Sequence, residues 1–306
     1  MVTDDEVPGM ARCAFLGLGV MGFPMAGHLA AAGHEVTVFN RTASKAERWT
    51  GVHAGRAASS PRAAADGAEF VLTCLGDDDD VRDVVYGDDG ALAGLGAGAV
   101  LVDHTTASAA LARELAAASA ARGAGFVDAP VSGGQAGAEN GVLTVMCGGD
   151  AAAFAKAEPV MAAYGRAVKR LGDVGSGQLT KMVNQICIAG LLQGLAEAVN
   201  FAQAAELDTD AVVDVISKGA AQSWQMENRW HTMAKDEFDF GFAVDWMRKD
   251  LAICLEEARR NGAPLPVTAL VDQLYREVQM AGGERWDTSS LVHNLRGSRT
   301  DSGRGR

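Results

Sequence analysis

A glycine-rich turn near the amino end constrains the fold more than any other feature of the chain. The segment Gly17-Leu18-Gly19-Val20-Met21-Gly22 follows an apolar run and precedes a helical pattern. A strand, a glycine turn and a helix in this order form a phosphate-binding site. Gly17 permits the tight turn, Gly19 lets a pyrophosphate approach the backbone, and Gly22 lets the helix pack on the strand. The pattern predicts a dinucleotide site, with Val20 and Met21 beside the phosphates.

The end of the next predicted strand, residues 35–39, indicates which dinucleotide binds. Folds that bind NAD place a carboxylate here to bind the ribose 2'-OH. This chain has Asn40-Arg41-Thr42, which supplies neutral and cationic donors and no carboxylate. Such donors suit a 2'-phosphate. We therefore expect NADP to be preferred, with NAD as the other possible cofactor.

The composition limits the class of partner. With 306 residues, of which 48% are hydrophobic and 22% charged, the chain is long enough for two globular domains. Its formal charge of −12 argues against binding to nucleic acid or an anionic membrane, because both need a basic surface. A site for a small carboxylate substrate would need local cations to offset this charge.

Other features indicate the compartment. The first ten residues are acidic and lack a secretory leader, and no stretch reads as an uninterrupted membrane span. The five cysteines are widely spaced without a CxxC pair, so we expect reduced core thiols: Cys13, Cys74, Cys147, Cys187 and Cys254. The six histidines are scattered, so no metal site is expected. These features predict a cytoplasmic protein.

The first part of the chain alternates short apolar strands with helical stretches. This alternation is typical of a mostly parallel sheet, and it predicts a Rossmann-type, doubly wound α/β domain over residues 11–175. Strands are expected at 70–75, 99–103, 126–128 and 143–147, a helix at 109–122, and glycine-dense connections at 87–98 and 133–141.

The second part of the chain is predicted to be all-helical. Residues 178–206 contain no proline and carry apolar side chains on nearly every face, which predicts a long buried helix of about 40 Å. Further helices are expected at 209–219, 245–261 and 266–281. The second domain would span residues 176–296, between flexible tails at 1–10 and 297–306. Its apolar helices are expected to bury against another subunit, in a homodimer or homotetramer.

A turn after a predicted strand is the first candidate for substrate binding. Asp128-Ala129-Pro130-Val131-Ser132-Gly133-Gly134 follows the strand at 126–127, at a carboxyl end where open α/β sheets bind ligands. Ser132, Gly133 and Gly134 offer backbone N–H groups and one hydroxyl to a carboxylate. An ordinary structural turn is the alternative interpretation.

Lys181 is the most informative single residue. It lies one turn into the long apolar helix, where burial lowers the pKa of an amine from about 10.4 toward neutrality and suits it to exchange a proton. Asn184, three residues further on, shares its helix face and could contact the same substrate. A lysine whose stem is buried and whose amine reaches water is the alternative.

Four motifs in this order resemble the successive signatures of the β-hydroxyacid dehydrogenases. They are the glycine turn with Met25-Ala26, the segment 128–134, the segment 177–184, and Lys249-Asp250. The family includes 3-hydroxyisobutyrate dehydrogenase and reductases of glyoxylate and succinic semialdehyde. The resemblance covers residues 12–295, and it implies a helical domain similar to that of 6-phosphogluconate dehydrogenase.

The resemblance also implies roles for particular residues. Lys181 would be the catalytic acid/base, residues 132–134 would bind the substrate carboxylate, and Asn184 would be a further substrate contact. Lys249 would reach the cofactor, Thr106 would match a position at the nicotinamide half, and Leu75 would match a position near the ribose. The implied reaction is hydride transfer between nicotinamide and a small β-hydroxy acid or its semialdehyde, without a metal.

Two departures and three rival functions accompany this resemblance. Gly76 stands where many relatives have proline, and Gln185 stands where some have a second asparagine. An NADPH-dependent imine reductase shares the architecture, but it has other residue types at the lysine position. A 6-phosphogluconate dehydrogenase needs a much longer helical domain. A non-catalytic protein that binds the cofactor and a partner is disfavoured by Lys181 and Ser132.

Overall fold

The computed structural model describes residues 9–300, with side chains as far as residue 296. The chain forms two compact units that divide between Lys181 and Met182. The division falls six residues after the end of the predicted first domain, inside helix α9 (Ser176–Ala204). The first turn of α9 therefore belongs to the dinucleotide-binding unit, and the remainder of the helix belongs to the second unit.

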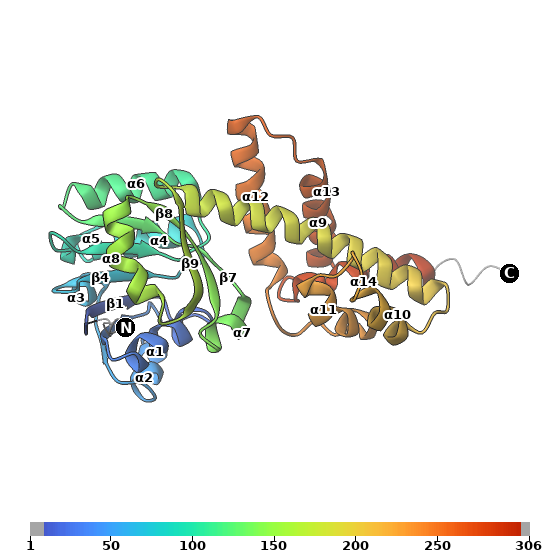
Figure 1. Cartoon of the computed structure of the whole chain (residues 1–306), viewed down its shortest axis with the longest axis horizontal. Coiled ribbons are helices and arrows are strands. Elements are labelled where there is room, and N and C mark those ends of the chain that lie inside the picture. Colours follow the sequence, from blue (N-terminus) through green and yellow to red (C-terminus); the bar gives the residue numbers. More distant parts are fainter. Residues whose placement is uncertain (1–8, 301–306) are drawn as a thin grey trace, which may run out of the picture. The chain divides into compact units, whose positions relative to one another are not determined.

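A parallel sheet forms the centre of the first unit (Figure 1). Its parallel strands are β1 (Arg12–Leu16), β2 (Glu35–Phe39), β3 (Arg56–Ala57), β4 (Phe70–Thr73), β5 (Val100–Asp103) and β6 (Gly125–Asp128). They lie in the order β3-β2-β1-β4-β5-β6, which is the doubly wound order of dinucleotide-binding domains. The chain reverses direction across the sheet between β1 and β4. The glycine turn at the end of β1 therefore lies where this fold binds ligands.

Alternating side chains on the strands build a core on each face of the sheet. Cys13 and Phe15 face the cluster beneath α1 (Gly22–Ala31), α2 (Ala43–Thr50) and α8 (Ala151–Met161). Ala14 and Leu16 face the opposite cluster, which is covered by α3 (Pro61–Ala65), α4 (Asp78–Val85), α5 (Ala91–Gly94) and α6 (Ala109–Ala120). Both faces are buried, as the near-continuous apolar strands predict.

The far end of the sheet departs from the sequence prediction. Strand β8 (Leu143–Gly149) pairs antiparallel with β6 and with β7 (Val131–Ser132), and parallel with β9 (Gly165–Gly172). The predicted connection at 133–141 contains a short helix, α7 (Gly134–Glu139), and the predicted connection at 87–98 contains α5. Strand β9 was not predicted, because its exposed face carries charged side chains and only part of it is apolar.

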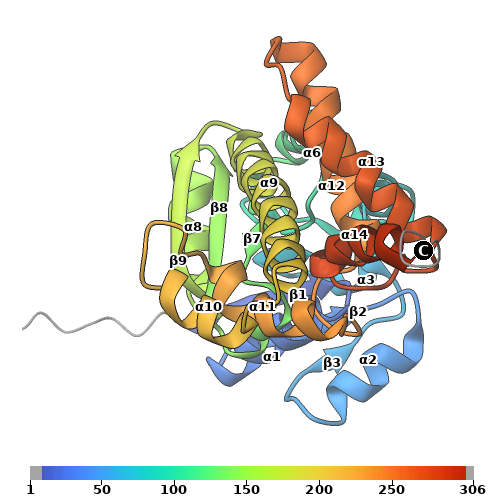
Figure 2. The same cartoon turned by 90° about the vertical axis from the view of Figure 1, so that its right-hand side faces the viewer.

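The second unit is helical, as predicted. After α9 it contains α10 (Thr209–Ile216), α11 (Trp224–Lys235), α12 (Val244–Asn261), α13 (Pro266–Met280), the 3-10 turn η1 (Thr288–Ser290) and α14 (Leu291–Thr300). Helices α12 and α13 lie side by side (Figure 2). Trp230 and Tyr275 are the largest fully buried side chains of its core. The Ser223 hydroxyl accepts a hydrogen bond from the Met226 N–H and starts α11.

Three sequence expectations are corrected here. Residues 297–300 of the predicted tail belong to α14, whereas residues 1–8 and 301–306 lie outside the described part of the chain. Helix α9 is only partly buried, and Val183 and Phe201 are 61% and 71% exposed. Of the predicted core thiols, Cys187 is exposed and Cys74 is half-buried, and none of the five cysteines forms a disulfide.

Helix α9 meets a length and composition criterion for a membrane span, although Lys181, Gly190 and Gly194 interrupt its apolar run, as the sequence indicates. Core helices of soluble proteins meet the same criterion. The helix buries three polar side chains, Gln178, Lys181 and Gln185. Such a pattern is typical of a helix that packs against protein.

Candidate active site

The glycine turn after β1 has the geometry of a phosphate site. Gly17 has a φ of +102°, and its N–H donates to the Phe39 carbonyl over 2.9 Å. Helix α1 begins without a side-chain cap. The Phe23 N–H donates to the Gly19 carbonyl and Pro24 has no N–H, whereas the Gly22 N–H has no partner among the described residues and is available to an anion. Space is open beside Gly19, where no heavy atom lies within 4 Å of an added Cβ. The residues of the turn therefore fit a bound pyrophosphate.

Two alanine substitutions should separate binding from folding in this turn. Gly19→Ala should leave thermal stability unchanged and weaken dinucleotide binding by at least about tenfold, since its methyl group points into space that the phosphates would use. Gly22→Ala should lower the melting temperature as well, because its Cβ would overlap the Gly17 carbonyl oxygen. Calorimetry and cofactor titration on both variants check this. Equal stability losses would contradict the assignment.

The residues after β2 hold the glycine turn in place and include one exposed cationic side chain, Arg41. The Asn40 side chain accepts a hydrogen bond from the Leu18 N–H over 2.8 Å and donates to the Thr42 carbonyl over 3.1 Å. Arg41 is 81% exposed and lies 3.3 Å from a carboxylate oxygen of Asp80. Thr42 precedes α2 without capping it through its hydroxyl. Asn40 therefore holds the glycine turn in place. The Arg41 guanidinium is exposed, and the Thr42 hydroxyl does not cap the helix, so both are donors that a ligand could use.

The carboxyl ends of β4 and β5 are joined by a buried hydrogen-bond network. The Asp103 carboxylate accepts from the Thr73 hydroxyl over 2.7 Å and from the Thr105 N–H over 3.0 Å. The Thr105 hydroxyl in turn accepts from the Leu75 N–H over 3.0 Å. Burial raises the pKa of Asp103 to about 6. The network sets the backbone at Leu75 and beside the half-buried Thr106, two of the predicted cofactor contacts.

His104 supports the next strand end. Its Nδ1 lies 2.7 Å from the Ala129 carbonyl, and its Nε2 lies 2.8 Å from the Tyr164 hydroxyl. A carbonyl only accepts, so Nδ1 carries the proton and the Tyr164 hydroxyl donates to Nε2. Burial lowers the pKa of His104 to about 4, which keeps the ring neutral. The ring thus holds the start of the segment that leads to Ser132.

The raised pKa of Asp103 predicts a pH-dependent stability. The folded protein binds this proton more tightly than the unfolded chain, so the group's contribution to stability falls as pH rises from about 4 to about 6. Asp103→Asn lacks the titrating group, and its stability relative to wild type should rise across that window by about 3 kcal/mol. Urea unfolding at several pH values measures this. The opposite contribution of His104 is common to both proteins and cancels, and the exposed Asp66→Asn variant serves as the control.

The predicted carboxylate-binding turn lies at the edge of the same unit. Ser132 ends β7, where it pairs with Thr144, and Gly133 and Gly134 are exposed. Gly133 has a φ of +135°, which favours glycine. Among the described residues the Ser132 hydroxyl has no hydrogen-bond partner. The turn therefore presents a hydroxyl and backbone N–H groups to a ligand.

Lys181 lies near the start of α9 and is only 8% exposed. Asp128, at the end of β6, holds this helix start: its carboxylate accepts from the Gly175 N–H over 2.8 Å and from the Gln178 N–H over 2.9 Å. Burial raises the pKa of Asp128, and these backbone bonds oppose that effect. The predicted acid/base is therefore attached to the sheet through a buried carboxylate.

The second unit holds the remaining predicted site residues in a polar chain. The Asn184 amide donates to the Gln185 side chain over 2.8 Å, and Gln185 donates to the buried Asp250 carboxylate over 2.6 Å. Asp250 also pairs with Lys249 over 3.2 Å. The Lys249 side chain is 20% exposed, so it is no ordinary surface charge. Asn184 and Lys249 therefore belong to one connected network.

Comparison with known proteins places the chain among dehydrogenases. Residues 12–172 match a family model described as the NAD binding domain of 6-phosphogluconate dehydrogenase. Residues 175–295 match a model described as NAD-binding of NADP-dependent 3-hydroxyisobutyrate dehydrogenase. The chain belongs to the β-hydroxyacid dehydrogenase family. It is an NAD(P)-dependent enzyme of that family, as the motifs predict.

Individual relatives of this dehydrogenase cover nearly its whole length. An uncharacterized oxidoreductase of Shewanella frigidimarina is 62% identical over 95% of the chain and 100% of the relative. A probable 3-hydroxyisobutyrate dehydrogenase-like protein of Arabidopsis thaliana is 40% identical over 95% and 86%. The solved 3-hydroxyisobutyrate dehydrogenase of Mycobacterium tuberculosis with L-serine is 30% identical, with a TM-score of 0.85, and the match covers 94% of this chain and 99% of that chain.

Sequence reasoning missed the residues of the dehydrogenase that hold the predicted contacts in place. Asp128 lay inside a quoted motif without a role, and Thr105 and Gln178 were not singled out. A signal was present for Asp103 and Asp128, because each is a carboxylate at the carboxyl end of an apolar strand. Asp128 accepts from N–H groups 47 and 50 residues further on, and Asp103 accepts from Thr73 on the neighbouring strand, 30 residues earlier, so these pairings needed the fold. Among the described residues no group of acidic, cysteine and histidine side chains is placed to hold a metal ion.

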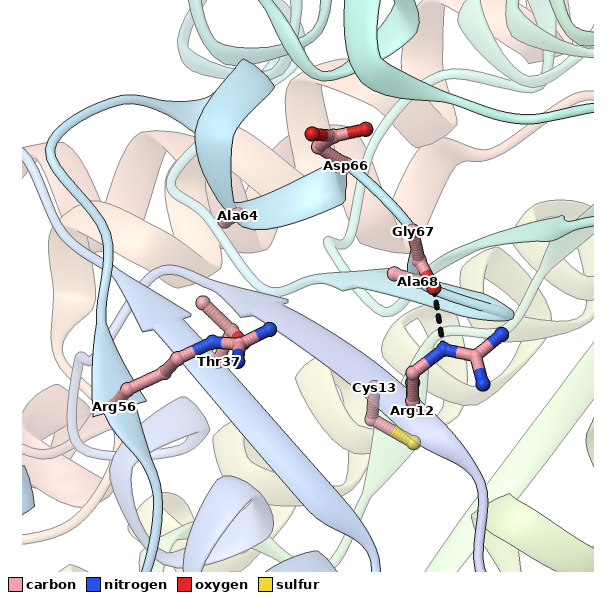
Figure 3. A pocket seen from close by; sticks show the side chains of 8 residues that line it. All are labelled: Arg12, Cys13, Thr37, Arg56, Ala64, Asp66, Gly67 and Ala68. Carbon is pink, nitrogen blue, oxygen red and sulfur yellow. Dashed lines mark hydrogen bonds between the residues drawn. The ribbon is translucent and has the colours of Figure 1, made fainter.

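A small pocket elsewhere in the dinucleotide-binding unit does not contribute to this site. It measures about 110 Å³ and lies beside the amino end of β1, whereas the glycine turn is at the carboxyl end. Figure 3 shows Arg12 and Arg56 among its lining residues. Arg12 donates to the Gly67 carbonyl and Arg56 to the Thr37 hydroxyl. We assign no ligand to this pocket.

Proposed function

We propose that the enzyme interconverts a small β-hydroxy acid and its semialdehyde or keto acid, in the manner of a 3-hydroxyisobutyrate dehydrogenase. The observation that carries the proposal is the buried amine of Lys181, on a helix whose first turn is bonded to the dinucleotide-binding sheet. Burial favours the neutral form of an amine and so suits a lysine in this setting to exchange a proton. The proposal makes Lys181 the catalytic acid/base.

The chain supplies binding and proton transfer in this proposal. In oxidation the neutral Lys181 amine takes the proton of the substrate hydroxyl, and in reduction the protonated amine returns it. Ser132 and the N–H groups of Gly133 and Gly134 bind the substrate carboxylate, and Asn184 contacts the substrate. Nicotinamide, when bound, accepts or donates the hydride at C4. Fixing the carboxylate positions the carbinol carbon and supplies much of the rate enhancement.

We further propose that NADP is preferred over NAD. Residues 40–42 carry no carboxylate, Arg41 is exposed, and Thr42 leaves its hydroxyl uncommitted at the start of α2. These donors support recognition of a 2'-phosphate. The Asp80 carboxylate lies beside Arg41 and disfavours a 2'-phosphate, so the balance between these two side chains decides the ratio of NADP to NAD affinity. Leu75, Thr106 and Lys249 are the further proposed cofactor contacts.

The apolar side chains on the surface of the helical unit support assembly into a homodimer or homotetramer. Val183, Leu191 and Phe201 are exposed along α9, and Val267 and Leu270 are exposed on α13. Several exposed apolar side chains on one unit are typical of a surface that another subunit covers. None of the five cysteines forms a disulfide, which supports a reducing compartment such as the cytoplasm.

A turnover panel tests the proposed function. Purified protein would be assayed with NADPH and with NADH against glyoxylate, succinic semialdehyde, methylmalonate semialdehyde and tartronate semialdehyde, and in oxidation against 3-hydroxyisobutyrate and serine. Turnover of one substrate, faster with NADPH, supports the proposal. A cyclic imine is assayed in the same panel, and turnover of the imine alone would indicate an imine reductase. Tight NADPH binding with no turnover of any substrate would indicate a non-catalytic binding protein.

A further inference from the structure

The side chain of Gln178 connects two segments that the proposed reaction uses. Its oxygen accepts from the Ala107 N–H over 3.0 Å, and its nitrogen donates to the Thr105 carbonyl over 2.7 Å. The residue is only 1% exposed. A single amide therefore bonds the first turn of α9 to the loop after β5 at two points, on either side of Thr106.

The loop held by Gln178 is itself fixed to the cofactor side of the sheet. The Thr105 N–H donates to Asp103, and the Thr105 hydroxyl accepts from the Leu75 N–H. The bonds thus run without a gap from Leu75 through Thr105 to Gln178. Each of these residues lies in the dinucleotide-binding unit, and so does Lys181.

The backbone of Gln178 is anchored separately from its side chain. Its N–H donates to Asp128, and the preceding Gly177 packs so closely on the end of β6 and on β8 that an added Cβ would overlap the carbonyls of Asp128 and Met146. The Asp128 bond and this contact hold the start of the helix against the sheet. The side-chain bonds to Thr105 and Ala107 fix its position along the loop.

We propose that Gln178 is a positioning residue that sets the place of the Lys181 amine relative to the loop at Thr106. This inference rests on the proposed function of Lys181. Residues 178 and 181 are three apart and share a face of α9, so a shift of the first helical turn moves both. A misplacement of about 1 Å can cost a hundredfold in rate when reacting groups must be aligned.

Removal of the amide gives the first test. In Gln178→Leu, we expect kcat to fall at least about tenfold while KM and the NADPH dissociation constant stay within about threefold of wild type. Gln193→Leu is the matched control, because it makes the same change on the same helix at a glutamine whose side chain bonds only Glu197 among the described residues. An unchanged kcat in Gln178→Leu, or an equal loss in the control, overturns the proposal.

The conservative variant Gln178→Glu gives a test by rescue. A protonated carboxyl offers a carbonyl oxygen to Ala107 and an O–H to Thr105, whereas the ionised form loses the donor. The carboxylates of Asp103 and Asp128 disfavour ionisation of a glutamate at position 178, and so does burial of this side chain, whereas the protonated amine of Lys181 on the same helix face favours it. In the reduction direction, the kcat of Gln178→Glu relative to wild type should therefore recover as pH falls. A ratio that does not change with pH contradicts the proposal.

A readout without cofactor or substrate separates this proposal from the proposed function. In protein carrying carbon-13-labelled lysine, the Lys181 Cε resonance is assigned by its loss in Lys181→Arg. It should move in Gln178→Leu and stay in place in Gln193→Leu. If no substrate is turned over but this resonance moves, the positioning role stands and the reaction is wrong. If turnover is found and neither kcat nor the resonance responds, the positioning role is wrong.

Discussion

Lys181→Ala is expected to lower kcat/KM at least about a hundredfold while the NADPH dissociation constant stays within about threefold of wild type. Proton transfer by a positioned side chain contributes about 10² to 10⁴ in rate, and no other described side chain on the first turns of α9 can exchange a proton at neutral pH. Single-turnover kinetics with the substrate found in the panel, together with cofactor titration, measure the two quantities.

A second substitution at the same position tests the role of the proton. Arginine keeps the positive charge but does not lose its proton in the accessible pH range. Lys181→Arg should therefore lose the oxidation reaction as fully as the alanine variant does. If the arginine variant oxidised substrate at more than about a tenth of the wild-type rate, the lysine would be acting through charge alone and not as a base.

Asp287→Ala is expected to lower the free energy of unfolding of the helical unit by about 3 to 5 kcal/mol. The Asp287 carboxylate is 1% exposed and accepts hydrogen bonds from Arg229, from the Phe242 N–H, and from both the N–H and the hydroxyl of Ser289. Removing it leaves these donors without their acceptor and the Arg229 guanidinium without its carboxylate.

Tryptophan fluorescence can measure this loss of unfolding free energy in the helical unit. Four of the five tryptophans, Trp224, Trp230, Trp246 and Trp286, lie in the helical unit, so their emission during urea unfolding reports mainly on it. Asp214→Ala removes an exposed carboxylate from α10 and should change stability by less than about 0.5 kcal/mol. A loss of stability for Asp287→Ala no larger than that of the control would show that the buried hydrogen bonds of the Asp287 carboxylate are not needed for stability.

Local patterns predicted most of the secondary structure because they depend on neighbours in the chain. The glycine turn, the apolar strands and the proline-free run of α9 are each visible within a few residues, and the strands and helices they predicted are confirmed to within a few residues at their ends. Helix α7 was read as a connection because its glycines disfavour a helix. Strand β9 was missed because its outer face is charged.

The residues of the candidate site also fall into two groups, those that a local pattern identified and those that it did not. Lys181, Ser132 and the glycines were found from residue type and position in a motif, since each stands next to a recognisable strand or helix. The buried polar residues that hold them in place were not identified from the sequence. Gln178 reaches residues about 70 positions earlier, and Asp128 reaches the helix start about 50 positions later. No local pattern specifies which of many buried polar side chains become partners.

The sequence by itself determined the family, the two kinds of architecture and the identity of the residues proposed to act, because these depend on residue types in order along the chain. Only the tertiary structure decided that Asn40 braces the glycine turn, that Lys249 is paired with Asp250, and that Gln178 fastens the lysine helix to the loop at Thr106. Such pairings form between strand ends and helix starts that are brought together by packing of the sheet and its helices, and packing is a property of the whole fold.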